Sequence, residues 1–339
     1  MRRTLSGRRI LITGAARGIG EKVARLAAAR GARMALVGLE PDRLRTLSAE
    51  LGAATVWREA DVRDGAALQT AIDECADAMG GIDALVANAG VVGYGTVRQT
   101  DDTAFARVLD INVNGVFRTL KSSTPHLHRS RGHAVVVASA ISFTPLAGLA
   151  SYAASKAGVE MLALAYRQEV VHLGITVGLV HPSWIDTDLV RGVDADLPSF
   201  RELRSRLPYP GNVTTSVDDA AAAIVRGVHR RRRRVYVPRA VGVANWGKAA
   251  VNSPVAWPWV RRMSSDLMPT MEREVDELGR QDQPLLSVAA HGASSASTAQ
   301  PNVLRRNASA LPTQPSPSKS AAKAQSPSHT QPPPLDPTR

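Results

Sequence analysis

Short apolar runs alternate with longer, alanine-rich stretches along most of the chain. Seven of these runs have the length and residue types of single strands: Ile10–Ile12, Met34–Val37, Thr55–Trp57, Ala84–Ala87, Val135–Val137, Thr176–Val180 and Val235–Val237. Their hydrophobicity is continuous along each run, which is typical of strands that are covered on both faces. Such strands, alternating with helices, predict a doubly wound parallel sheet in a single α/β domain over residues 1–239.

Residues 240–281 differ from this pattern and predict a separate C-terminal extension. Its first half contains three tryptophans among small apolar residues: Trp246, Trp257 and Trp259. Lys248 and two prolines interrupt this stretch, which excludes an ordinary membrane-spanning helix.

The second half of the extension predicts a short helix. Pro269 stands near its expected start and Gly279 just past its expected end. Met271, Val275 and Leu278 fall on one stripe of that helix. We expect the stripe to pack on the same domain or on a second subunit, in preference to a peripheral membrane contact.

Residues 282–339 change to serine, alanine, proline, glutamine and threonine. Such a segment has too little apolar surface to offset the entropy lost on ordering, so it is predicted to be a disordered tail.

The chain has 339 residues and a net charge of +12, with a pI near 10.6. Such a balance raises nucleic acid or an anionic membrane as partners. However, no nucleic-acid motif is present, and many arginines fall in helical segments. The run Arg230–Arg234 follows a helix that is expected to begin at Ser216 with Asp218 and Asp219 in its first turn, so it complements the helix dipole. A solvated basic surface without specific nucleic-acid binding is expected.

Cys75 is the only cysteine, and the first nine residues are too polar for a secretory leader. These features predict a cytoplasmic protein without an intrachain disulfide, and we expect no metal site.

A glycine-rich segment follows the first predicted strand and opens a helix. It reads Thr13-Gly14-Ala15-Ala16-Arg17-Gly18-Ile19-Gly20. Glycines permit a tight turn there, and the free amides of a helix N-terminus attract a pyrophosphate. The segment therefore predicts a dinucleotide site in a Rossmann-type fold.

Tyr152 and Lys156 lie four residues apart in a helical segment, with Ser139 upstream. This spacing places the phenol and the ammonium on one helix face, where the cation would lower the pKa of the phenol. Together with the glycine-rich turn, it indicates proton transfer at a carbonyl group.

The chain resembles the short-chain dehydrogenase/reductase family from about Gly7 to Pro238. Further segments match family motifs at Asp61-Val62, Asn88-Ala89-Gly90, Asn112, Ser139 and His181–Thr187. Ser183 and Ala87 depart from the usual glycine and asparagine of those motifs.

The resemblance implies a role for each matched residue. Tyr152 would exchange a proton with the substrate oxygen, Lys156 would lower the pKa of Tyr152 and bind the nicotinamide ribose, Ser139 would polarise the carbonyl, and Asn112 would hold a relay water. The implied cofactor-binding residues are Gly14, Arg17, Gly18, Ile19, Gly20, Gly38, Asp61, Val62, Asn88, Ala89, Gly90, Tyr152, Lys156, Pro182, Ile185 and Thr187.

The cofactor is predicted to be NADP, with NAD as the alternative. Gly38 stands where an acidic residue would bind the ribose 2′-hydroxyl and repel a 2′-phosphate. The resemblance also favours NADP through Arg17, since related NADP-using members carry a basic residue at that position, whereas Glu40 favours NAD if it reaches the ribose.

The predicted function is an NAD(P)-dependent oxidoreductase that acts on CH–OH groups and interconverts an alcohol and a carbonyl by hydride transfer. The loop between Asp188 and Thr215 is expected to select a partly apolar substrate, and a homodimer or homotetramer is expected. The alternatives are an inactive, cofactor-binding regulator and a lipid-active reductase at a membrane surface.

Overall fold

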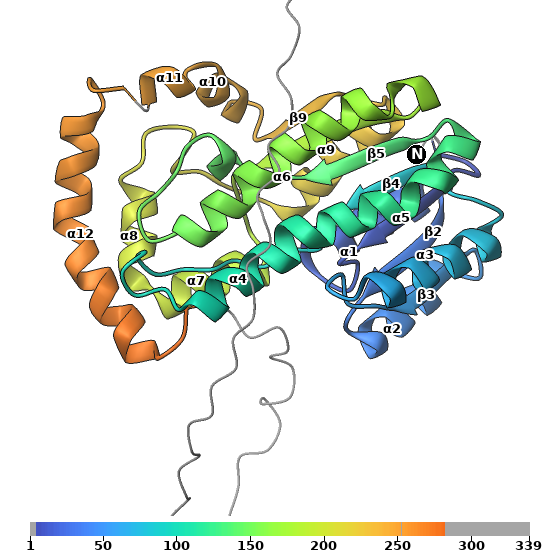
Figure 1. The fold of residues 1–339 in the computed structure, drawn as a ribbon, viewed down its shortest axis with the longest axis horizontal. Coiled ribbons are helices and arrows are strands. Elements are labelled where there is room, and N and C mark those ends of the chain that lie inside the picture. Colours follow the sequence, from blue (N-terminus) through green and yellow to red (C-terminus); the bar gives the residue numbers. More distant parts are fainter. Residues whose placement is uncertain (1–4, 252, 282–339) are drawn as a thin grey trace, which may run out of the picture. The chain divides into compact units, whose positions relative to one another are not determined.

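The computed structural model describes residues 5–251 and 253–281, so the prediction for the tail from residue 282 lies outside the described residues. Within this range, seven strands form one parallel sheet in the order β3-β2-β1-β4-β5-β6-β9 (Figure 1). The strands are β1 (Arg9–Thr13), β2 (Arg33–Gly38), β3 (Thr55–Glu59), β4 (Ala84–Ala87), β5 (His133–Val137), β6 (Thr176–Pro182) and β9 (Arg234–Val237). All seven contain the predicted runs, and the predicted doubly wound fold is confirmed.

Helices cover both faces of the sheet. One face packs against α3 (Gly65–Met79), α5 (Gly115–Ser130) and α6 (Ala150–Glu169). The other packs against α1 (Gly18–Ala29), α2 (Pro41–Leu51) and α9 (Val217–His229), whose N-cap is Ser216 as predicted. This double cover explains the continuous hydrophobicity of the strands. Both faces of β1, β2, β4, β5 and β6 are largely buried, whereas β3 and β9, at the two edges of the sheet, are only partly buried.

Shorter elements lie between these layers and after the sheet. They are α4 (Asp102–Leu109), the π-helix η1 (Asp110–Asn114), the 3-10 helices η2 (Ala140–Ser142) and η3 (Val171–Leu173), β7 (Trp184–Ile185), α7 (Asp188–Asp196), α8 (Pro198–Ser205), β8 (Thr214–Thr215), α10 (Val241–Trp246), α11 (Lys248–Val251) and α12 (Trp257–Leu278).

Two expectations about element boundaries were wrong. The segment after Asp188 is not a simple loop, because residues 188–205 form α7 and α8. The C-terminal helix begins at Trp257, with a proline in its first turn, and Pro269 lies inside it. The helix continues through Pro269 because Met263 and Leu267, which precede it, are buried, and this burial offsets the cost of an interior proline.

Helix α12 packs on the rest of the unit through a third apolar cluster. Met271 and Val275 of the predicted stripe are buried there with Phe200 and Leu203 of α8. The carboxylate of Glu274 also accepts hydrogen bonds from the backbone N of Ser199, at 3.1 and 3.2 Å. None of the helices among the described residues has both the length and the hydropathy needed to cross a bilayer.

A matched pair of substitutions tests this packing. Val275 is 2% exposed and Val255, in the same extension, is 89% exposed. Val275→Ala should lower the free energy of unfolding by about 2 kcal/mol, from two lost methyl groups and the cavity that remains. Val255→Ala should change it by less than about 0.5 kcal/mol. Urea unfolding measures both, and equal effects would contradict the packing of α12.

Candidate active site

Two positions of the glycine-rich turn between β1 and α1 leave no room for a side chain. Gly14 has a φ of +65°, and a Cβ added there would lie 2.8 Å from the Cα of Ala89. A Cβ at Gly20 would lie 2.2 Å from the carbonyl oxygen of Gly14. Both positions therefore require glycine, and the turn lies directly against the segment that follows β4.

Asn88 fastens this turn to β4. Its Nδ2 donates hydrogen bonds to the carbonyl oxygens of Thr13 and Gly14, at 3.2 and 3.0 Å. Its backbone N donates to the hydroxyl of Thr13 at 3.2 Å. Asn88 thus holds the glycine-rich turn in place, and the adjoining Ala89 and Gly90 continue along the same edge of the sheet.

The N-terminus of α1 has the features of an anion site. Gly18, Ile19 and Gly20 form its first turn, and Arg17, the N-cap residue, makes no side-chain capping hydrogen bond. The first backbone N–H groups of a helix have no partner within the helix, so they remain to bind a pyrophosphate. A Cβ at Gly18 would lie 3.6 Å from the Cγ2 of Thr187, so the segment containing Pro182, Ile185 and Thr187 borders the same place.

The adenosine end of the predicted cofactor site lies beside β2 and β3. Arg17 and Glu40 form an ion pair there, with Nε and Oε1 3.0 Å apart. Arg17, which was expected to favour NADP, and Glu40, which was expected to favour NAD, are therefore bound to each other. Gly38 has room for a side chain, because the atom nearest to an added Cβ lies 3.7 Å away.

Asp61 follows β3, immediately before Val62. Burial raises the pKa of Asp61, but hydrogen bonds from Arg63 outweigh this effect and hold the pKa below its usual range. The carboxylate is therefore ionised at neutral pH and available as an acceptor at this end of the site.

Ser139, Tyr152 and Lys156 come together beyond the carboxyl end of β5. Tyr152 lies in the first turn of α6, and a hydrogen bond joins its phenol to Ser139. The ammonium of Lys156 lies 5.7 Å from the centroid of the Tyr152 ring and donates to the carbonyl oxygen of Val137 at 3.2 Å. Lys156 is buried, so its charge is held in place with little water around it.

Burial shifts both titratable groups towards their neutral forms. It raises the pKa of Tyr152 to about 12, against the smaller lowering effect of the Ser139 hydrogen bond. It also lowers the pKa of Lys156 to about 8. In the protein without cofactor, loss of solvent dominates the pKa of Tyr152. The expected lowering of this pKa by Lys156 together with the charge of the cofactor stays a prediction.

Asn112 lies in η1 and is fully buried. Its amide accepts from the backbone N of Val91 at 2.8 Å and donates to the carbonyl oxygen of Val91 and to the hydroxyl of Ser155, both at 2.9 Å. A Cβ on Gly90 would lie 3.0 Å from Asn112 Oδ1 and 3.4 Å from Lys156 Nζ, so these two atoms converge over Gly90. The relay role of Asn112 stays a prediction, with one lone pair of Oδ1 available for it.

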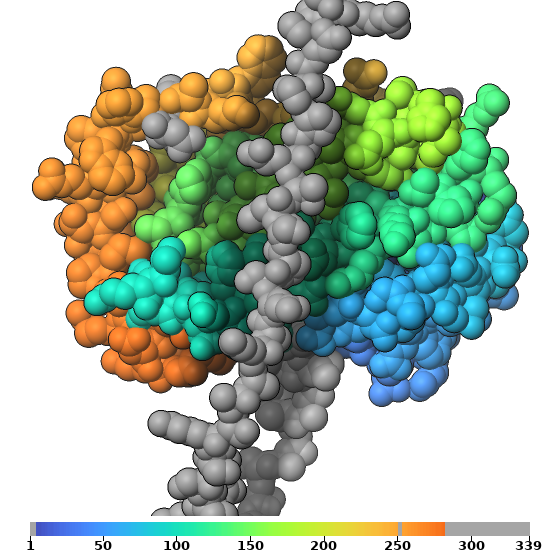
Figure 2. Space-filling view, viewed as in Figure 1, coloured from blue at the N-terminus to red at the C-terminus, as the bar shows by residue number. Residues whose placement is uncertain are grey.

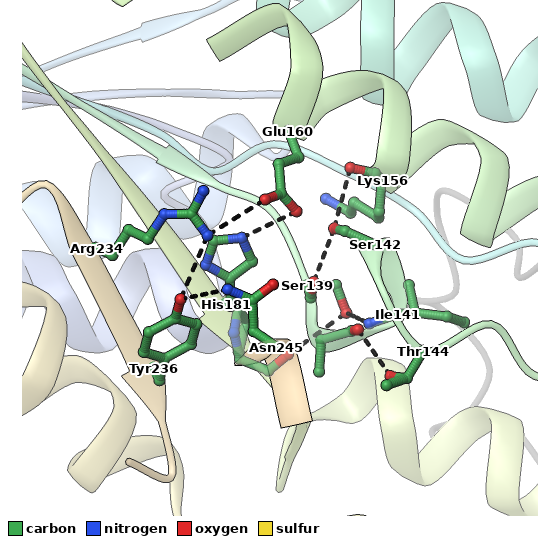
Figure 3. Close-up of polar contacts among 12 residues, drawn as sticks. Ser139, Ile141, Ser142, Thr144, Lys156, Glu160, His181, Arg234, Tyr236 and Asn245 are labelled. Atoms are coloured by element: carbon green, nitrogen blue, oxygen red, sulfur yellow. Dashed lines mark hydrogen bonds and ion pairs between the residues drawn. The ribbon is translucent and has the colours of Figure 1, made fainter. Parts of the chain in front are cut away.

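A polar network around the buried residues Glu160 and His181 lies behind the candidate site and was missed by the sequence analysis. Figure 3 shows Glu160, one turn beyond Lys156 on α6, turned towards His181 and Arg234. Glu160 Oε2 lies 3.2 Å from His181 Nε2, and Oε1 lies 3.5 Å from Arg234 Nη1. Tyr236 stacks on His181 with ring centroids 5.3 Å apart and accepts a hydrogen bond from Asn245 at 2.8 Å.

This network ties α6 to β6, β9 and α10. The spacing Tyr152, Lys156, Glu160 repeats every four residues and would have revealed Glu160 as a member of the same helix face. Nothing in the sequence pairs it with Arg234 or links Asn245 to Tyr236. Within residues 5–251 and 253–281, no group of three or more His, Cys, Asp or Glu side chains is arranged to hold a metal ion.

The network predicts a stability that depends on pH. Burial raises the pKa of Glu160, but the neighbouring His181 and the charges of Arg234 and Lys248 outweigh it, so the pKa is lowered. A lowered pKa contributes stability that is present above the unfolded-state pKa of about 4.3 and is lost as pH falls through the folded-state value. Glu160→Gln should lower the free energy of unfolding by about 2 kcal/mol at pH 7. The difference in free energy of unfolding between this variant and the wild type should shrink under acidic conditions.

Glu169→Gln, an exposed change on the same helix, is the control for unfolding measured between pH 3 and 8. A difference between Glu160→Gln and the wild type that stays constant over this range would contradict the role of the charge.

Comparison with known proteins identifies the family. A family model described as short chain dehydrogenase matches residues 8–198. Nodulation protein G of Rhizobium sp. (strain N33) is 34% identical over 184 residues, which cover 54% of this chain and 75% of that protein. The cis-4-hydroxycyclohexanecarboxylate dehydrogenase of Sinomonas cyclohexanicum is 32% identical over 229 residues, or 64% of this chain and 92% of that protein.

A solved structure agrees with these matches. A short chain dehydrogenase from Burkholderia cenocepacia J2315, in complex with NADP, superposes with a TM-score of 0.60 at 32% identity and covers 66% of this chain and 91% of that one. The chain therefore belongs to the short-chain dehydrogenase/reductase family of NAD(P)-dependent oxidoreductases.

Proposed function

We propose that this protein interconverts a partly apolar alcohol and its carbonyl compound, with NADP as the preferred cofactor. The observation that carries the proposal is the group formed by Ser139, Tyr152 and Lys156 beside the glycine-rich turn. The nicotinamide cofactor, when bound, supplies or accepts the hydride. The protein's own residues bind the dinucleotide, orient the carbonyl group and move the proton.

The phenol of Tyr152 is the proton donor in the direction of reduction. With a pKa of about 12 it holds its proton at neutral pH, and it is hydrogen-bonded to Ser139. The hydroxyl of Ser139 orients the substrate oxygen. As the proton leaves, the nearby ammonium of Lys156 stabilises the phenolate.

The surroundings of Tyr152 favour an apolar substrate. Tyr152 packs at the border of the third apolar cluster, beside Ile141, Leu149 and Trp184. Residues of α7 and α8 complete this cluster, so the segment after Asp188 contributes to selectivity as two helices. The ring of Trp184 is fixed by an edge contact to Phe200, with centroids 5.5 Å apart.

The cofactor preference rests on Gly38 and Arg17. No acidic side chain extends from Gly38, so nothing at that position repels a 2′-phosphate. The guanidinium of Arg17 is held at this end of the site by Glu40. The Burkholderia cenocepacia relative, which was solved with NADP, supports the same preference.

Removing the phenol hydroxyl tests the proton-transfer role. Tyr152→Phe should lower kcat by about 10²- to 10⁴-fold, because general acid catalysis contributes a factor of this size. Cofactor affinity, measured by quenching of intrinsic fluorescence, should change little. Tyr166→Phe removes another hydroxyl from the same helix, where it contacts Thr124 at 2.8 Å, and should keep nearly full activity. A Tyr152→Phe enzyme that turns over a true substrate at the wild-type rate would refute the proposal.

A charge at position 38 tests the cofactor preference. Gly38→Asp should weaken NADPH binding at least about tenfold and favour NADH, because like charges meet at the 2′-phosphate. Gly38→Asn has nearly the same volume without the charge, so it should keep the preference for NADPH. Titration of each variant with both cofactors measures the order, and tighter binding of NADH by the wild type would overturn the preference.

A further inference from the structure

The C-terminal extension has an apolar surface that the rest of the described chain leaves uncovered. We name it the tryptophan corner and define it by four side chains with their exposed fractions: Trp246 89%, Val255 89%, Trp257 60% and Trp259 46%. Several large apolar side chains at this exposure on consecutive elements of one extension are unusual, and such a surface indicates a binding face.

The corner continues the buried stripe of α12 beyond the body of the protein. Residues four apart lie on one face of a helix. Followed in steps of four towards the start of α12 and one step beyond it, the exposed fractions are Val275 2%, Met271 0%, Leu267 4%, Met263 8%, Trp259 46% and Val255 89%. The face of α12 that packs against α8 therefore continues beyond α8, where its residues are exposed.

Three elements meet at this corner. Figure 1 shows α10 and α11 leading to the start of α12, and Figure 2 shows atoms of these elements, in orange, at the outer surface of the folded unit. Asn245, next to Trp246 on α10, donates a hydrogen bond to the Tyr236 hydroxyl at 2.8 Å. This bond fastens α10 to β9, so the corner has a fixed place on the folded unit.

The charge around the corner is positive. Arg239, Lys248, Arg261 and Arg262 are exposed, and no aspartate or glutamate occurs from residue 239 to residue 265. Tryptophan is enriched at the headgroup level of membranes, and basic side chains are attracted to anionic lipids.

From this combination we propose that the tryptophan corner docks the protein on the surface of an anionic membrane. The indole rings enter the headgroup region, and the exposed side chains of Arg239, Arg261 and Arg262 pair with lipid phosphates and carboxylates. A second copy of the chain fits this face less well, because a symmetric contact would place the same positive residues against each other.

Flotation with vesicles tests the proposal on the full-length protein. The protein should float at low salt with phosphatidylcholine vesicles that contain phosphatidylserine and stay behind with pure phosphatidylcholine. Added salt should release it, since ionic attraction is screened. Indole fluorescence should shift to shorter wavelength on binding, because Trp246, Trp257 and Trp259 leave water.

Two corner variants should lose this binding. Trp246→Ala/Trp259→Ala removes the apolar contact, and Arg261→Glu/Arg262→Glu removes the charge contact. Each should reduce the vesicle partition coefficient by at least about tenfold. For the arginine variant the reason is that every basic residue near an anionic surface contributes about fivefold to this coefficient. Melting temperature should stay near that of the wild type, because all four side chains are exposed or half-exposed.

The matched control is Arg232→Glu/Arg233→Glu, which changes the net charge equally at exposed positions outside the corner. It should keep most of the vesicle binding. The proposal is overturned if the wild type does not bind the anionic vesicles, or if this control loses as much binding as the corner variants. It is also overturned if the tryptophan variant changes the oligomeric mass and leaves vesicle binding intact, which would assign the corner to a second copy of the chain.

Discussion

The seven-stranded parallel sheet gathers the cofactor-binding segments of the candidate site at one edge. All of the strands end at one edge, and their order reverses between β1 and β4. The glycine-rich turn follows β1 and Asn88 follows β4, so the two segments meet where the order reverses, and Asn88 fastens them together. A dinucleotide binds at such a point because the loops diverge there and a helix N-terminus faces the opening.

Helix α6 places three ionisable side chains near this edge of the sheet. Its first three turns present Tyr152, Lys156 and Glu160 in succession, and each meets a different environment. Loss of water raises the pKa of the Tyr152 phenol and lowers the pKa of the Lys156 ammonium. In contrast, His181 and Arg234 lower the pKa of Glu160, which stays ionised. The same helix thus carries the proposed proton donor, Tyr152, and the ion pair between Glu160 and Arg234 that links it to the sheet.

The C-terminal extension joins two roles in one helix. The central part of α12 buries Met271 and Val275 against the elements that border Tyr152, so it supports the substrate side of the site. Its first turn projects beyond those elements with Trp257 and Trp259 exposed among basic residues. A membrane contact at that turn would hold the enzyme at a lipid surface, where apolar alcohols and ketones accumulate.

The sequence by itself determined the seven strands, the helix from Ser216, the glycine-rich turn and the spacing of Tyr152 and Lys156, because each depends on local pattern or on residues close in the chain. Only the tertiary structure decided that Arg17 pairs with Glu40, that Glu160 meets Arg234, and that α12 continues through Pro269. These features depend on contacts between distant segments and on burial. The pKa of Tyr152 belongs with them, since the loss of water that raises it follows from packing that no spacing in the sequence expresses.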